Sequence, residues 1–97
     1  MAKFGELISV DKPVLIKFCA NSNDTENQIT TLTNVAATLR ENAKVIKINV
    51  AENKALVDAL EVQNIPTFMI CKKGEIKWRQ AGFKDDKTLI GLVLNYV

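Results

Sequence analysis

The segment from Val14 to Cys19 constrains the fold more than any other, because it is apolar at every position except Lys17. A strand with one solvent-facing side would alternate polar and apolar residues. A continuous apolar strand is instead typical of a sheet that helices cover on both faces. The segment therefore predicts a central strand in an α/β sandwich.

Helical and extended patterns alternate on both sides of this strand. A short amphipathic helix is expected near Phe4 to Ile8, and a helix of about 16 residues after a polar loop whose residues 23–25 are candidate N-caps. The apolar stripe of the long helix consists of Ile29, Leu32, Ala36 and Leu39. The later expected elements are a strand at 45–50, a helix at 55–60, a hairpin of strands at 68–71 and 76–81, and a last helix capped by Asp85 or Asp86. This order predicts an α/β fold with a mixed four-stranded sheet and helices on both faces.

Length and charge limit the classes of function. The 97 residues suffice for a single domain with one core. The net charge is only +2 and the lysines are scattered, so nucleic acid is not an expected partner. The apolar runs are far shorter than the roughly 20 residues of a membrane-spanning helix, and a signal-peptide pattern is missing, so we expect a cytoplasmic protein without a membrane partner. Histidine is absent, and the sequence predicts neither a metal site nor a cofactor.

Several separated blocks resemble the thioredoxin family. They are Lys12-Pro-Val-Leu-Ile-Lys-Phe18, Lys47-Ile-Asn-Val-Ala-Glu-Asn53, Val62-Gln-Asn-Ile-Pro-Thr67, Lys73-Gly-Glu75 and Ala81-Gly82. Their spacing fits the family without gaps from about Lys12 to Val93, and several blocks in register carry more weight than one motif. The resemblance implies a thioredoxin fold over residues 1–97, without that family's first edge strand and with a cis peptide bond before Pro66.

The reactive Cys-x-x-Cys motif of that family has lost both cysteines here. The resemblance places Asn23 and Glu26 at the two positions, and Lys17 at the position of the family's buried acid. Neither an amide nor a carboxylate can attack or resolve a disulfide, so we expect no dithiol-disulfide exchange. Two arrangements of Lys17 are open: an ion pair with Glu26 beneath the helix start, or an ammonium that extends to solvent while Glu26 complements the helix N-terminus.

The chain has two cysteines, and they do not form a redox pair in the sequence. If the strands pair antiparallel with Thr67 near Cys19, the sulfurs of Cys19 and Cys71 lie about 13 Å apart, beyond disulfide reach. Cys19 borders the former active-site loop. It is therefore the candidate single thiol of an alternative function, a divergent oxidoreductase in cell redox homeostasis, whereas apolar packing is the other interpretation.

The resemblance also implies a groove that in thioredoxins holds an extended substrate segment. The corresponding residues are Ser22, Asn23, Thr25, Ile65, Pro66, Gly82 and Phe83, and we call this set the groove. Ile65 and Phe83 would supply apolar anchors, although packing of Phe83 on the last helix is an open alternative. The predicted function is a redox-inactive, thioredoxin-like binding or scaffold module for a protein or an extended peptide. The oligomeric state stays open, because an exposed sheet edge left by the absent strand is a place where chains can pair.

Overall fold

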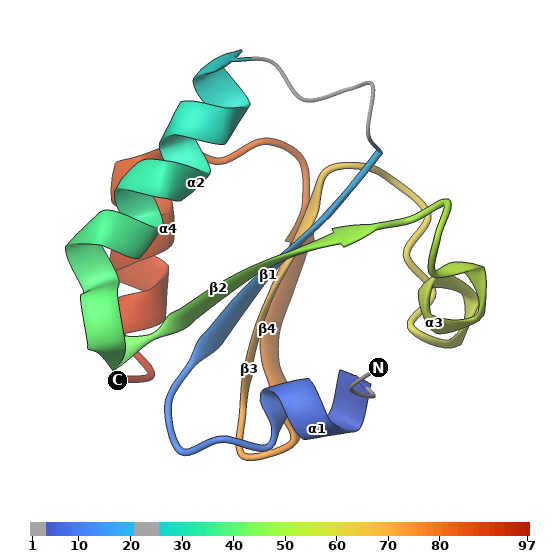
Figure 1. The fold of residues 1–97 in the computed structure, drawn as a ribbon, viewed down its shortest axis with the longest axis horizontal. Helices are drawn as coiled ribbons and strands as arrows, with labels where there is room; N and C mark the ends of the chain where they lie inside the picture. Colours follow the sequence, from blue (N-terminus) through green and yellow to red (C-terminus); the bar gives the residue numbers. More distant parts are fainter. Residues whose placement is uncertain (1–3, 21–25) are drawn as a thin grey trace.

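The computed structural model describes residues 4–20 and 26–97, and the side chains of residues 26–28 lie outside this description. Its helices are α1 (Phe4–Ile8), α2 (Glu26–Leu39), α3 (Lys54–Ala59) and α4 (Asp86–Leu94), with a 3-10 turn at Arg40–Asn42. Its strands are β1 (Val14–Cys19), β2 (Lys44–Asn49), β3 (Thr67–Lys72) and β4 (Glu75–Ala81). The element order is the one expected from the sequence (Figure 1).

The strands form one mixed sheet in the order β2-β1-β3-β4. Strand β1 runs parallel to β2 and antiparallel to β3, and β3 and β4 form an antiparallel hairpin. The predicted four-stranded α/β fold is therefore confirmed, with β2 at one edge of the described sheet.

Helices cover both faces of the sheet, with α2 and α4 together on one side and α1 and α3 on the other (Figure 1). All six residues of β1 are buried. Leu15 packs into the core beneath α2 and α4, whereas Ile16 and Phe18 pack into the core beneath α1 and α3. The apolar run of this strand, broken only at Lys17, is thus explained, because its apolar side chains enter two different cores.

The buried stripe of α2 differs from the expected one. Leu32 and Leu39 are buried as predicted, but Ile29 is 50% exposed, and Ala36 is exposed while Val35 is fully buried. The helix packs against α4 as well as against the sheet, and this second contact turns its buried arc toward Val35. Ile29 and Ala36 consequently lie outside the core.

The start of α4 has a well-defined cap. Asp85 is the N-cap, and its side chain accepts a hydrogen bond of 2.8 Å from the Thr88 backbone N–H, while Asp86 lies in the first turn. Leu89 and Val93 are buried beneath this helix. Among the described helices, none has the length and apolar character needed to cross a membrane.

Candidate functional site

The candidate site lies where the carboxyl end of β1 leads into α2. Three predicted groove residues, Ser22, Asn23 and Thr25, lie outside the described residues, and so does the side chain of Glu26, whose backbone begins α2. The replacement of both redox cysteines therefore rests on the sequence. The other predicted residues of the site are described by the structure, and they are Lys17, Cys19, Ile65, Pro66, Gly82 and Phe83.

Two loops of the groove lie side by side at one end of the sheet. The Gly82 backbone N–H donates a 2.9 Å hydrogen bond to the Pro66 carbonyl. Gly82 has a φ of 101°, a conformation in which an L side chain would be strained. The Ile65–Pro66 peptide bond is cis. The structure thus brings together the four groove residues that it describes, two from the loop before β3 and two from the loop after β4.

The end of β1 is adjacent to these loops. The antiparallel register pairs Phe18 with Thr67, one residue from the pairing of Cys19 with Thr67 that the sequence suggests. The carboxyl end of β1 therefore lies beside the start of β3, which directly follows the Ile65–Pro66 loop.

The apolar side chains of the groove are accessible. Ile65 is 39% exposed and Phe83 is 47% exposed. Phe83 does not belong to the described core beneath α2 and α4, and its partial packing on the last helix stays a prediction. Ile65 and Phe83 thus lie on two loops that the Gly82–Pro66 hydrogen bond joins, and both side chains are accessible to a partner.

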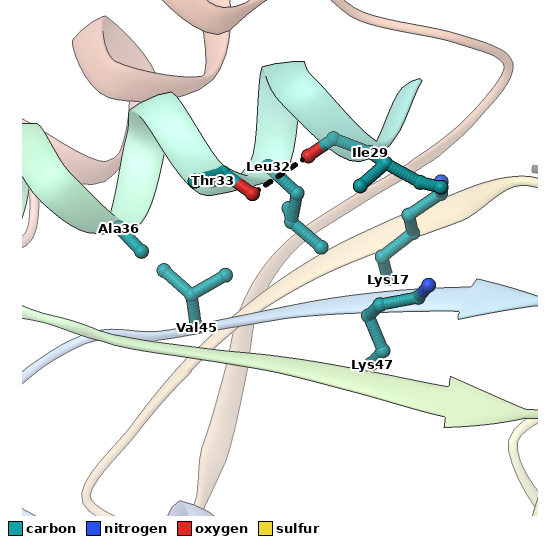
Figure 2. Close-up of a pocket in the computed structure, with 7 residues that line it drawn as sticks. All are labelled: Lys17, Ile29, Leu32, Thr33, Ala36, Val45 and Lys47. Atoms are coloured by element: carbon teal, nitrogen blue, oxygen red, sulfur yellow. Dashed lines mark hydrogen bonds between the residues drawn. The ribbon is translucent and has the colours of Figure 1, made fainter. Parts of the chain in front are cut away.

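Lys17 is the buried charged residue of the site, with an exposed fraction of 2%. Its side chain extends from β1 toward Ile29 on α2 (Figure 2). This burial contradicts the arrangement in which the ammonium extends to solvent. Lys17 has an interaction partner in the structure. An ion pair with Glu26 stays a prediction, because that carboxylate lies outside the described residues.

A cavity of about 370 Å³ lies beneath α2 and beside Lys17. The register pairs Lys17 with the exposed Lys47 on β2, so two ammonium-bearing side chains border the same space. The full lining is Lys17, Ile29, Leu32, Thr33, Ala36, Val45 and Lys47. Sequence reasoning missed this cavity. The apolar stripe of α2 does contain a signal of this cavity, because its members Ile29 and Ala36 line the cavity and do not belong to the core.

The two cysteines lie in different parts of the core and neither forms a disulfide. Cys19 is 6% exposed, and its thiol donates a long hydrogen bond of 3.9 Å to the Ile48 carbonyl. Cys71 pairs in register with Val14, at the far end of β1 from Cys19. Burial raises the pKa of the Cys71 thiol to about 11, so this group is protonated at neutral pH and is a poor nucleophile. Within the described residues, no cluster of three or more His, Cys, Asp or Glu side chains is placed to hold a metal ion.

Comparison with known proteins gives one consistent family. A family model described as Thioredoxin matches residues 1–95. The thioredoxin of Rickettsia typhi is 30% identical over 86 residues, which are 88% of this chain and 82% of that protein. The thioredoxin of Rickettsia bellii is 29% identical over 93 residues, covering 95% and 89% of the two chains. Among solved structures, the N21Q mutant thioredoxin from Halobacterium salinarum NRC-1 has 32% identity and a TM-score of 0.72, over 89% of this chain and 75% of that chain.

Proposed function

Since this chain belongs to the thioredoxin family, we propose that it is a protein-binding module that has lost dithiol-disulfide reductase activity and holds an extended segment of a partner protein in the groove. One observation carries the proposal. The chain's two cysteines are buried in strands β1 and β3, and neither stands at position 23 or 26.

The loss of activity follows from what thiol-disulfide exchange requires. A thiolate must attack a disulfide of the substrate to form a mixed disulfide, and a second thiol must then displace the reduced product. Asn23 and Glu26 supply neither group. The raised pKa of Cys71 and the burial of Cys19 keep both remaining thiols from replacing them.

The binding role is supported by the groove. Exposed Ile65 and Phe83 provide apolar contact area, and an extended partner segment would lie along the two loops that carry them. The proposed partner is therefore a protein or peptide segment and not a nucleic acid or a membrane. We also propose a cytoplasmic location, where cysteines without a disulfide partner, such as Cys19 and Cys71, are common.

Insulin reduction with dithiothreitol tests the loss of activity. We expect insulin to precipitate no faster with this protein than without it, while an active thioredoxin run in parallel accelerates the reaction. Turnover that Cys19→Ser abolishes and Cys71→Ser leaves unchanged would overturn the proposal. It would instead support the alternative of an oxidoreductase that works through the single thiol of Cys19.

Substitution of the exposed anchor tests the groove. Proteins captured by the wild-type chain should be lost with Phe83→Glu, because a charge on that side chain removes its apolar contact. Ile76→Glu is the matched control, since Ile76 lies on β4 and is 41% exposed. A partner that binds Phe83→Glu and wild type equally would contradict binding in the groove, provided that circular dichroism shows both variants folded.

A further inference from the structure

Strand β2 presents an open edge of the described sheet. Its residue Lys44 donates a backbone hydrogen bond of 3.0 Å to the Pro13 carbonyl, on the β1 side. Alternate residues of a parallel strand bond to the same neighbour, so the even-numbered residues of β2 bond to β1. The backbone groups of Val45 and Lys47 therefore point away from β1, toward the side where the described sheet has no further strand.

The face of β2 beneath α1 and α3 carries apolar side chains at this edge. Ile48 is buried in the core there, and Ile46 is partly buried against it. A cavity of about 390 Å³ opens beside them, and its full lining is Phe4, Leu7, Ile46, Lys47, Ile48, Asn49, Glu52, Asn53 and Leu56. Phe4, Leu7 and Leu56 are only partly buried. Apolar surface thus borders the outward backbone groups, and both are features of an edge that pairs with another strand.

A two-fold axis perpendicular to the sheet would make two copies of β2 antiparallel neighbours. Residues that pair in this way share a face of the sheet. With Ile46 on the axis, Val45 of each copy lies opposite Lys47 of the other, and their outward backbone groups can exchange hydrogen bonds. On the face beneath α1 and α3, Ile46 meets Ile46, and Lys44 meets Ile48. Like charges directly opposite each other would destabilise the pairing, but within β2 this register sets neither lysine opposite a lysine.

The same register brings opposite charges together. Lys44 is exposed, and its long side chain, opposite Ile48 of the other copy, would lie at the cavity beside that residue. The acidic residue in the lining of this cavity is Glu52. The two-fold axis repeats the contact between Lys44 and Glu52, so a dimer contains it twice. Because the net charge of each copy is only +2, the general repulsion between two copies is weak.

We propose that the open edge of β2 binds a second copy of this chain, so that two four-stranded sheets join into one continuous sheet across a two-fold axis near Ile46. The interface consists of the β2 backbone, the apolar side chains around the cavity, and the contact of Lys44 with Glu52 of the other copy. The two copies of β1 run in opposite directions, so the two grooves lie at opposite ends of the joined sheet. This last consequence rests on the proposed function, whereas the dimer interface shares no residue with the groove and stands independently of it.

Sedimentation velocity over a concentration series tests the dimer. We expect the wild-type chain to dimerise at about 100 µM or below. Lys44→Glu should weaken the dimer about tenfold or more, because two carboxylates then face each other, and Glu52→Lys should do the same with two ammonium groups. The double variant Lys44→Glu, Glu52→Lys should restore the affinity to within about threefold of wild type. Lys87→Glu makes the same charge change on α4, away from β2, and should dimerise as wild type does.

Backbone measurements distinguish this edge from any other interface. Amide hydrogen exchange at Val45 and Lys47 should slow as the protein concentration rises, since pairing gives their outward N–H groups acceptors. Val45→Pro removes one of these donors at a sheet edge, where proline is tolerated, and should leave a monomer. Val45→Thr is its control and should still dimerise.

Four results would overturn the proposal. They are a wild-type monomer at about 1 mM, a folded Val45→Pro variant that still dimerises, a double charge variant that dimerises no better than the single ones, and exchange that slows with concentration at Ile65 and Phe83 instead of β2. The charge variants keep the proposal falsifiable if Val45→Pro does not fold. None of these results decides whether a partner binds in the groove, which Phe83→Glu tests separately.

Discussion

Replacement of Glu26 by glutamine tests how the buried charge of Lys17 is accommodated. Lys17 is 2% exposed and extends toward the first turns of α2, the helix that Glu26 begins (Figure 2). Removal of one partner from a buried ion pair costs about 3–5 kcal/mol, because the remaining charge stays buried without compensation. With so little solvent to screen Lys17, we expect Glu26→Gln to lower the free energy of unfolding by about 3 kcal/mol. For a domain of this size that loss lowers the melting temperature by roughly 15 °C.

A double-mutant cycle isolates the pair from other effects of the substitution. Lys17→Met removes the ammonium and keeps most of the side-chain volume, so in that background Glu26→Gln should cost less than about 0.5 kcal/mol. The coupling energy between the two positions is then about 2.5 kcal/mol. Glu41→Gln is the matched control, since Glu41 is exposed in the 3-10 turn and the same chemical change there should have little effect.

Urea unfolding followed by the fluorescence of Trp78, the single tryptophan, measures all of these variants. An additive cycle, with a coupling energy below about 0.5 kcal/mol, would refute the argument. The buried ammonium would then be compensated by a group other than Glu26.

Three further predictions concern groups with defined environments. Stability should fall from about pH 9 to about pH 11, because the Cys71 thiol loses its proton near 9.0 when unfolded but only near 11 when folded; Cys71→Ala should remove this slope from urea titrations. The hydrogen bond from Thr88 lowers the pKa of Asp85, so its stabilisation is present above the unfolded pKa and is lost as the pH falls through the folded value. Asp85→Ala should lower the melting temperature at neutral pH, and Asp85→Asn should keep the cap but remove that acid dependence. Arg79 donates a 2.6 Å hydrogen bond to the Leu60 carbonyl at the end of α3, and Arg79→Met should cost about 1 kcal/mol and speed amide exchange in that helix.

The fold could be predicted because its main signals are local. The apolar run of Val14 to Cys19 and the cap at Asp85 are set by neighbours along the chain, and both led to the observed elements. Which side chains of α2 are buried could not be predicted in the same way. Val35 is buried because α4 packs against it, and a single-helix pattern does not contain that contact.

The candidate site could be predicted only where the resemblance supplied positions. The sequence named Ile65 and Phe83, but their exposure depends on how two loops meet through the bond from Gly82 to Pro66. It left two arrangements for Lys17, and the burial of that residue removed one of them. The cavities beside β2 depend on how separate elements pack, because one lies between α2 and strands β1 and β2 and the other between α1, α3 and β2.

This chain differs from an active thioredoxin at positions 17, 23 and 26. We expect the ammonium of Lys17 to act electrostatically on groups at the other two positions. If Glu26 compensates the buried ammonium, then Glu26→Cys replaces a carboxylate by a neutral thiol and incurs the cost of an unpaired lysine. Ionisation of that introduced thiol restores a negative charge beside Lys17, so the lysine should lower its pKa. In the double variant Asn23→Cys, Glu26→Cys, we therefore expect a more acidic thiol than in the same variant with Lys17→Asp added, because an aspartate there opposes ionisation. Titration of thiolate absorbance measures both, and equal values would show that Lys17 does not act on the redox positions.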